Sequence, residues 1–240
     1  MGLTKTALFK FYNTNQQKIM DRERESIKKT IDYLRSHNAV MWDFDGVIKD
    51  SVDIKTRAYQ SLFMPYGSDI AKLVKEHHEA NGGMSRFDKI PVYLSFAGLD
   101  QSEQVIEDFC DRFSRLVMNG VIESPWVPGV KEYLLESSTN QLFVIVTATP
   151  QAEIEIILDR LGISKCFRKV YGAPIKKELA ISNAMKIFAL SPSEVIMIGD
   201  SKSDLEAATR NSIPFLLRRT IINNDLVKSY NGPQFEDLLQ

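Results

Sequence analysis

The sequence has 240 residues, of which 44% are apolar and 25% charged, and this composition is that of a globular chain able to bury a full core. Its 30 Lys and Arg residues nearly balance its 31 Asp and Glu residues, so the overall charge argues against nucleic acid or an anionic membrane as a partner. The two cysteines, Cys110 and Cys166, lack metal-ligand spacing. The absence of a signal-peptide pattern and of any apolar run long enough to cross a bilayer leads us to expect a cytoplasmic protein.

The first predicted elements are a helix and a strand that ends in acidic residues. Apolar residues at helical spacing predict a helix over residues 21–37. The apolar run Ala39–Trp42 then predicts a buried strand that stops at Asp43 and Asp45. Side chains at i and i+2 leave a strand on the same side, so both carboxylates can face one site. Packing alone does not explain two charges there, because burial of a charge costs free energy unless a cation or hydrogen bonds offset it.

The next segment has a different character. Residues 53 to about 119 contain no run of strand formers, and their apolar side chains recur at helical spacing. The stretch S-P-W-V-P-G-V at residues 124–130 closes the segment with two prolines and a glycine. We therefore predict an all-helical domain over 50–127, inserted between the core segments 1–49 and 128–240.

Strands and helices alternate after the insert. Apolar runs predict strands at 142–146, 168–171, 195–198 and 213–217, each followed or preceded by a helical pattern. Thr149 is expected to be the N-cap of the helix that Pro150 begins. Residues 235–239 are expected to form a last short helix. This alternation predicts an α/β fold, with a Rossmann-like parallel sheet covered by helices on both faces.

Polar residues follow several predicted strands at the sheet edge where ligands bind in open parallel sheets. They are Asp43 with Asp45, Thr147, the pair Lys176 and Lys177, and Asp200 with Asp204. Taken singly, each group has a purely structural interpretation. The threonine could be a turn residue, the lysines could be solvated charges, and Asp200 could be an N-cap. Together they suit phosphoryl transfer. Three carboxylates suit Mg²⁺, one carboxylate can attack phosphorus, a second can move a proton, and the hydroxyl, backbone N–H groups and ammonium can hold phosphoryl oxygens.

The motifs resemble those of the haloacid dehalogenase superfamily. D-F-D-G-V at 43–47 is similar to its first motif, V-T-A at 146–148 to its second, the lysine at 176 or 177 to its third, and G-D-S-K-S-D at 199–204 to its fourth. A helical insert directly after the first motif resembles the cap of the phosphoglycolate phosphatase and β-phosphoglucomutase branch. The resemblance covers the chain from Val40 to about Phe215.

The resemblance implies a role for each motif residue. Asp43 is expected to attack phosphorus and bind Mg²⁺, and Asp45 to be the general acid and base and to bind Mg²⁺ through its backbone carbonyl. Asp200 is expected to be a metal ligand that Asp204 supports. Thr147, the Ala148 amide and Lys177 are expected to bind the phosphate. The number of residues between Gly172 and the lysine fits the family better for Lys177 than for Lys176.

Substrate choice is expected to lie in the insert. Its candidate residues are Gly83, Ser85, Arg86, Lys55 and Arg57. Glycines allow close backbone approach to a ligand, and the Arg86 guanidinium suits a carboxylate, a hydroxyl or a second phosphate. The alternative for Arg86 is a surface ion pair. His77 and His78 could line the same pocket, although the favoured interpretation is an exposed pair at a helix end.

The sequence thus predicts a Mg²⁺-dependent hydrolase, a phosphatase for a small phosphorylated metabolite that forms an aspartyl-phosphate intermediate. The alternatives are a phosphomutase, a phosphonate hydrolase and a non-catalytic binding protein. The mutase branch usually has a histidine where this chain has Lys55, and the phosphonate reaction needs a Schiff-base lysine in the insert. Intact motif acids argue against a non-catalytic protein. A monomer or a homodimer is expected.

Overall fold

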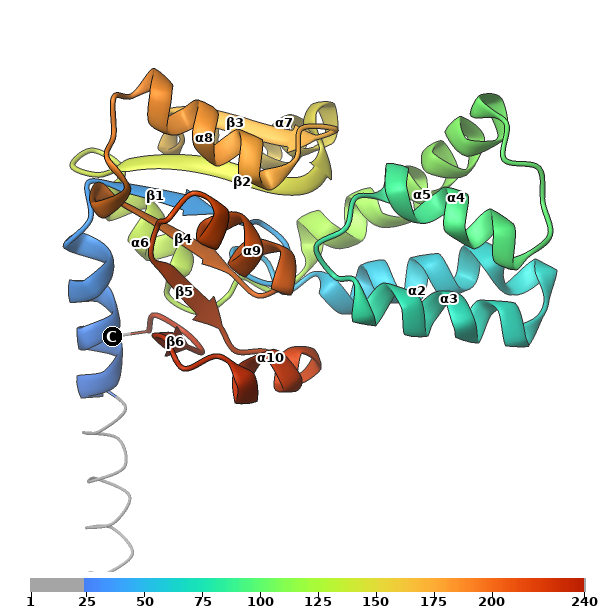
Figure 1. Cartoon of the computed structure of the whole chain (residues 1–240), viewed down its shortest axis with the longest axis horizontal. Helices are drawn as coiled ribbons and strands as arrows, with labels where there is room; N and C mark the ends of the chain where they lie inside the picture. Colours follow the sequence, from blue (N-terminus) through green and yellow to red (C-terminus); the bar gives the residue numbers. More distant parts are fainter. Residues whose placement is uncertain (1–23, 240) are drawn as a thin grey trace, which may run out of the picture.

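The computed structural model describes residues 24–239 (Figure 1). Within this range the strands form a six-stranded parallel sheet in the order β3-β2-β1-β4-β5-β6. The strands are β1 (Ala39–Trp42), β2 (Leu142–Pro150), β3 (Lys169–Ala173), β4 (Val195–Gly199), β5 (Phe215–Arg218) and β6 (Gln234–Phe235). A parallel sheet with helices confirms the predicted fold class.

The sheet is buried on both faces because alternate side chains of each strand contribute to two different cores. Val40 and Trp42 of β1 pack on one face with α6 (Val130–Ser137) and α7 (Gln151–Arg160). Ala39 and Met41 pack on the other face with α8 (Lys177–Ile187) and α9 (Lys202–Arg210). This arrangement explains why the strands are continuous apolar runs rather than alternating sequences.

The order of the strands places a crevice between β1 and β4. From β1 the chain proceeds outward through β2 to β3 on one side, and it then returns to β4 beside β1 and continues outward through β5 to β6 on the other side. Loops leaving β1 and β4 therefore diverge, and the carboxyl ends of these two strands border an opening in which ligands bind in such sheets.

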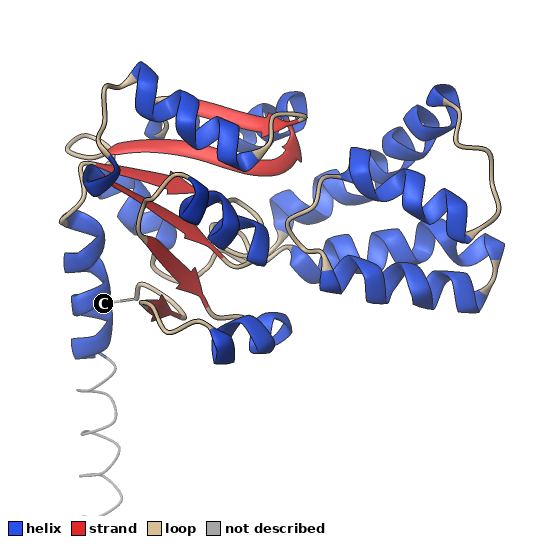
Figure 2. Cartoon of the chain, viewed as in Figure 1, coloured by secondary structure: helices blue, strands red, loops and turns tan. Residues whose placement is uncertain are grey.

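The segment between β1 and α6 is helical and forms a separate unit beside the sheet (Figures 1 and 2). Its helices are α2 (Val52–Phe63), α3 (Ser68–Ala80), α4 (Arg86–Phe96) and α5 (Glu103–Glu123). Their interior is aromatic, and Tyr59 stacks on Phe113 with ring centroids 3.8 Å apart. We call this unit the helical insert; the domain limits 50–127 remain a prediction.

Two chain segments connect the helical insert to the sheet, and they run side by side. The Asp50 amide donates to Pro125 O at 2.8 Å, and the Val127 amide donates to Ile48 O at 3.0 Å. The buried Lys49 side chain lies over the Trp126 ring and donates to Ile122 O at 3.0 Å. The entry and exit of the insert are therefore one hydrogen-bonded ribbon.

Several predicted elements differ from the structure. Residues 235–239 are not helical, because Gln234–Phe235 pairs with β5 as strand β6 and the Leu238 amide donates to Pro128 O at 2.9 Å. The sequence analysis missed α6 and α10 (Asn224–Ser229). The predicted helix at 21–37 is present over residues 24–35, and its first residues lie outside the described range. No helix among residues 24–239 is long and apolar enough to cross a membrane.

Candidate active site

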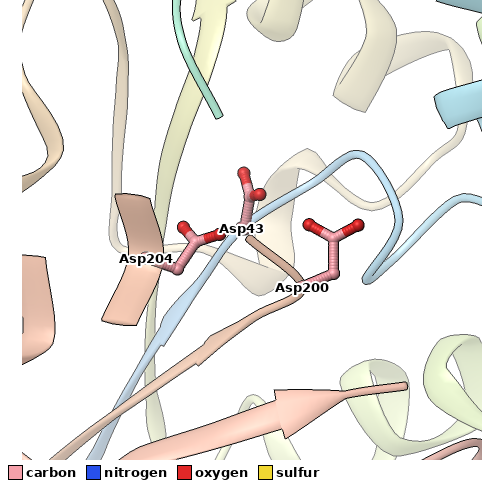
Figure 3. A group of neighbouring side chains, drawn as sticks. All are labelled: Asp43, Asp200 and Asp204. Carbon is pink, nitrogen blue, oxygen red and sulfur yellow. The ribbon is translucent and has the colours of Figure 1, made fainter. Parts of the chain in front are cut away.

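Three aspartates meet at the carboxyl ends of β1 and β4 (Figure 3). Asp43 follows β1 and its amide donates to Ile198 O at 3.0 Å, which ties the end of β1 to β4. Asp200 follows β4, and Asp204 lies in the first turn of α9. Carboxylate oxygens of Asp43, Asp200 and Asp204 lie within 4.8 Å of one another, and all three residues are buried.

This cluster fits a divalent cation. Its donors are carboxylate oxygens, the ligands that Mg²⁺ prefers. Burial, reinforced by the charge of Asp204, raises the pKa of Asp43 to about 7. Burial and the charge of Asp43 raise the pKa of Asp200 well above its ordinary value. The site therefore disfavours its own negative charge, and a bound cation would relieve that cost.

The only ammonium ion-paired with this cluster among the described residues is that of Lys177. Its Nζ lies 3.0 Å from Asp43 Oδ2 and 2.6 Å from Asp204 Oδ1. Lys177 is the first residue of α8 and is buried, whereas Lys176 is exposed on the outside of the same turn. The structure thus places Lys177, rather than Lys176, beside the first aspartate.

Asp204 is oriented by groups on both of its oxygens. One oxygen receives Lys177, and the other accepts hydrogen bonds from the Ser201 amide at 3.1 Å and the Ser201 hydroxyl at 2.5 Å. This reciprocal arrangement is the capping box that begins α9. Asp204 therefore fixes the position of Lys177 while it closes the helix end.

Asp45 faces the helical insert instead of the aspartate cluster. It forms an ion pair with Lys55 of α2, and it accepts hydrogen bonds from Ser51 at 2.6 Å and Thr149 at 2.9 Å. Burial raises its pKa, but the charge of Lys55 and these hydrogen bonds outweigh that effect and hold the pKa below its ordinary value. Asp45 is therefore a hydrogen-bond acceptor in this structure.

The loop leaving β1 requires a glycine directly after Asp45. Gly46 has φ of 76°, and a Cβ atom there would lie 2.2 Å from Asp200 Oδ2. Any other residue would be strained in this conformation and would collide with the third carboxylate of the site. Gly46 O also accepts a hydrogen bond from Arg218 at 3.1 Å.

Thr147 and Ala148 complete the sheet side of the site. Both line the cavity that contains Asp43, and the Thr147 hydroxyl accepts a hydrogen bond from the Thr149 amide at 3.2 Å. Strand β2 continues to Pro150, with a register shift after Val146. Thr149 is therefore not a helix N-cap as predicted. Its hydroxyl is directed to Asp45 because it lies in the strand extension beside the β1 loop.

A cavity of about 630 Å³ connects these groups to the helical insert. Its wall on the insert includes Lys55, Gly83 and Arg86. Two other candidates lie elsewhere: Ser85 caps α4, and Arg57 is exposed and pairs with Asp53 at 2.9 Å. The structure thus brings some of the candidate residues predicted in the insert to the cavity.

Arg86 is not a surface residue, and its guanidinium is not free to bind a ligand. It is 4% exposed, and two of its nitrogens each lie 2.7 Å from a Glu153 oxygen. Ser114 of α5 joins the pair by hydrogen bonds to both residues. Because Glu153 belongs to α7, this ion pair connects the insert to the sheet domain.

Gly83 lies close to another segment of the protein, the start of α9. A Cβ atom at Gly83 would lie 1.8 Å from Ser203 Oγ and 2.5 Å from Ser201 Oγ, so the glycine permits contact between the insert and the start of α9. Residues 82–83 thus touch the loop that carries Asp200.

Sequence reasoning missed several residues that surround the site. Lys89 was not singled out. For His78, exposure at a helix end was favoured over the alternative of lining the pocket, and the structure shows the alternative, because His78 is 3% exposed and lines the cavity. Ser51 and Thr149 contact Asp45, and Asn223 donates to Asp200 O at 2.7 Å. The helical spacing of His78 with Val74 and Ala71 was the one available signal that His78 faces inward.

The geometry and the motifs agree with comparison to known proteins. Residues 40–217 match the model of the haloacid dehalogenase-like hydrolase family. The chain therefore belongs to that family.

Curated relatives include phosphatases. Phosphoglycolate phosphatase 1 of Pseudomonas aeruginosa is 26% identical over 179 residues, which are 70% of this chain and 64% of that protein. A phosphorylated carbohydrates phosphatase of Thermotoga maritima is 25% identical over 177 residues, covering 71% of this chain and 79% of the relative. The chain thus spans less than two thirds of the length of the first of these relatives.

Solved structures show the same fold. β-Phosphoglucomutase from Clostridium difficile has a TM-score of 0.66 and 19% identity, with 84% of this chain and 92% of the other covered. A predicted phosphoglycolate phosphatase from Haemophilus somnus has a TM-score of 0.64 and 19% identity, with coverages of 85% and 95%.

Proposed function

We propose that this protein is a Mg²⁺-dependent phosphatase that hydrolyses a small phosphorylated metabolite through an aspartyl-phosphate. The observation that carries the proposal is the buried arrangement of Asp43, Lys177, Asp200 and Asp204 at the crevice between β1 and β4. The activities named for the two curated relatives, on phosphoglycolate and on phosphorylated carbohydrates, support it.

In the first half of the proposed reaction, an Asp43 oxygen attacks phosphorus and the bond from phosphorus to the leaving oxygen breaks. The leaving oxygen takes a proton from Asp45, which must acquire that proton before this step because it accepts hydrogen bonds in the structure. Lys177, the Thr147 hydroxyl and the Ala148 amide would hold the phosphoryl oxygens.

In the second half, Asp45 accepts a proton from water as the water oxygen attacks phosphorus. The bond between phosphorus and Asp43 breaks, which releases inorganic phosphate and restores the free carboxylate. Asp43, the Asp45 carbonyl and Asp200 would hold Mg²⁺, which supplies charge stabilisation for the phosphoryl group when bound.

The test is phosphate release by the purified chain across sugar, polyol, amino-alcohol and carboxylated phosphates, with Mg²⁺ and with EDTA. We expect release with Mg²⁺, loss in EDTA and recovery when Mg²⁺ is restored. Asp43→Asn should lower kcat by roughly 10⁴-fold or more while the circular dichroism spectrum stays unchanged, because the nucleophile is lost.

Asp53→Asn is the matched control, because Asp53 is an exposed aspartate of α2 that pairs with Arg57 away from the cavity. Its activity should equal that of the wild type. Turnover retained by Asp43→Asn would remove the nucleophile assignment, and activity indifferent to EDTA would remove the metal. Isomerisation of a sugar phosphate without phosphate release would establish the phosphomutase alternative.

A further inference from the structure

A buried arginine beside the crevice between β1 and β4 has no part in the proposed reaction. Arg218 is the last residue of β5 and is 7% exposed. Among residues 24–239 its one ion-pair partner is Asp50, whose side chain is 53% exposed and lies 3.3 Å away. An ion pair with an exposed partner contributes little free energy, so it does not offset the cost of burying a guanidinium. The other contacts of Arg218 must explain its burial.

These other contacts are made with backbone carbonyls. Arg218 Nη1 donates to Gly46 O at 3.1 Å, and its Nε donates to Glu236 O at 3.3 Å. Strand β4 lies between β5 and β1 in the sheet, so the side chain reaches past the end of β4 to the loop that leaves β1. Arg218 therefore connects β5 to the β1 loop across the strand end that Asp200 follows.

Gly46 is the residue through which this contact reaches the site. It directly follows Asp45, whose backbone carbonyl is a proposed ligand of the cation. It also lies against Asp200, because a Cβ atom at Gly46 would be 2.2 Å from Asp200 Oδ2, and the β1 loop passes beside Asp200 in Figure 3. Gly46 is thus held between Arg218 and Asp200, and a shift of its loop would move two proposed ligands relative to each other.

A second residue of the same segment holds the other loop of the site. The Asn223 side-chain amide donates to Asp200 O at 2.7 Å and to Arg218 O at 2.8 Å. Its side-chain oxygen accepts from the Thr220 amide at 2.8 Å, which fixes the orientation of the amide. Residues 218–223 contain none of the four motifs, yet they contact the backbone of both loops that supply proposed metal ligands. We call Arg218 and Asn223 the carbonyl clamp.

We propose that the carbonyl clamp positions the metal site: Arg218 sets the loop that follows β1, and Asn223 sets the loop that follows β4. The Asp45 carbonyl and the Asp200 carboxylate are thereby presented to the same cation. The inference rests on the proposed function and adds two positioning residues to it. Substitution of groups that orient metal ligands from behind typically lowers metal affinity or activity by about 10- to 100-fold.

The charge of Arg218 and its hydrogen bond to Gly46 act on cation binding in opposite directions. A guanidinium near three carboxylates repels a cation, so loss of its charge alone should strengthen Mg²⁺ binding. Loss of the hydrogen bond should weaken binding, because the β1 loop is then free to shift. Arg218→Met retains an apolar stem and removes both effects. Positioning predicts that its Kd for Mg²⁺ rises by about tenfold or more.

The experiment is calorimetric titration of the purified proteins with MgCl₂ alone, which requires no substrate. Arg218→Lys keeps the charge but loses the planar guanidinium, so it should retain only part of the affinity. Asn223→Ala should weaken binding independently, through the loop that carries Asp200. Arg219→Met is the matched control, because Arg219 is the exposed neighbour of Arg218 and pairs with Glu236 at 3.6 Å. It should bind Mg²⁺ as the wild type does.

Kinetics add a measurement that a purely structural role would not change. Arg218→Met and Asn223→Ala should raise the Mg²⁺ concentration that gives half-maximal phosphate release, while KM for the substrate at saturating Mg²⁺ changes less than about threefold. Asp50→Asn removes the ion pair of Arg218 but leaves its contact with Gly46. It should behave as the wild type in both measurements.

Mg²⁺ binding is measured without turnover, so failure of this inference is distinguishable from failure of the proposed function. Weaker binding in both clamp variants supports the inference even if the wild type releases no phosphate. The inference is overturned, and phosphatase activity stands, if Arg218→Met binds Mg²⁺ as tightly as an active wild type, or if Arg219→Met weakens binding equally. If circular dichroism shows Arg218→Met unfolded, an unchanged Kd in both Arg218→Lys and Asn223→Ala overturns it.

Discussion

Lys89 and Arg86 leave the same helix of the insert but meet opposite electrostatic surroundings. Arg86 has the carboxylate of Glu153, two hydrogen bonds to it and the ring of Phe113 4.8 Å from its guanidinium carbon. Lys89 has a neutral imidazole and faces other cations. Burial, together with the positive charge of Lys55, lowers the pKa of Lys89 to about 7. A group that titrates there changes its charge near neutral pH.

The pH dependence of stability tests this ionisation. In the unfolded chain Lys89 has its ordinary pKa of 10.5, so above about pH 7 the unfolded state binds a proton that the folded state lacks. We expect the free energy of unfolding of the wild type to rise relative to that of Lys89→Met as pH increases above about 7, and urea denaturation at several pH values measures it. The difference cancels the ionisations that both proteins share, including those of the aspartate cluster.

The groups that face Lys89 are His78 and His77 from α3, Lys55 from α2, and Asp45 and Lys177 from the sheet domain. His78 stays neutral across this pH range because its pKa is about 2. Lys89→Arg is the control, since a guanidinium remains charged in both states, and the wild type should gain stability over it with pH in the same way. A difference that stays level with pH for both variants would assign the titration to another group.

At the scale of elements, the ion pair of Arg86 in α4 with Glu153 in α7 links the helical insert to the sheet domain. Glu153→Gln leaves Arg86 buried without a charge partner. We expect a loss of about 2 kcal/mol in the free energy of unfolding, below the 3–5 kcal/mol typical of a broken buried pair, because the amide oxygen still accepts one hydrogen bond. Urea denaturation followed by circular dichroism measures it.

Glu155→Gln is the matched control because Glu155 lies on the exposed side of the same helix and accepts from Gln151 at 2.6 Å. Its unfolding free energy should stay within about 0.5 kcal/mol of the wild type. Equal effects of the two substitutions would show that the pair with Arg86 contributes no net stability.

Elements whose sequence pattern is local were predicted well. Elements whose structure depends on a partner distant in the sequence were predicted poorly. The apolar runs of β1 and β4, and the acidic residues directly after them, were identified from the sequence, whereas the crevice between these strands follows from the strand order. Residues 235–239 were predicted to form a helix, but pairing with β5 makes Gln234–Phe235 a strand. Nothing near Arg86 in sequence reveals Glu153, which is 67 positions away.

The helical insert illustrates a second limit. Its helices were predictable from periodicity, but which side chains face the cavity depends on how the insert rests on the sheet domain. Lys55 reaches Asp45, whereas Arg57, two residues later on the same helix, points to solvent. The pair of His78 and Lys89 comes from two helices whose register against each other the sequence does not fix.

At the scale of the whole molecule, the fold gathers acidic side chains at a buried end of the sheet. Asp43 and Asp200 end neighbouring strands, and Asp204 begins the helix that follows the second of them. Lys177 compensates one of these charges, and Arg218 reaches the Gly46 carbonyl beside them instead of the carboxylates. The architecture that creates the site therefore also makes the metal-free protein less stable.

Thermal unfolding with and without Mg²⁺ tests this relation between site and stability. A ligand that binds only the folded state stabilises it by about 2.7 kcal/mol at a hundred times its Kd, so saturating Mg²⁺ should raise Tm by several degrees. Asp200→Asn should abolish that increase because Asp200 is one of the proposed ligands of the cation. The same substitution should raise Tm in EDTA, since it removes a buried charge beside Asp43. Asp53→Asn should leave both temperatures unchanged, and a Mg²⁺ response that survives Asp200→Asn would place the cation elsewhere.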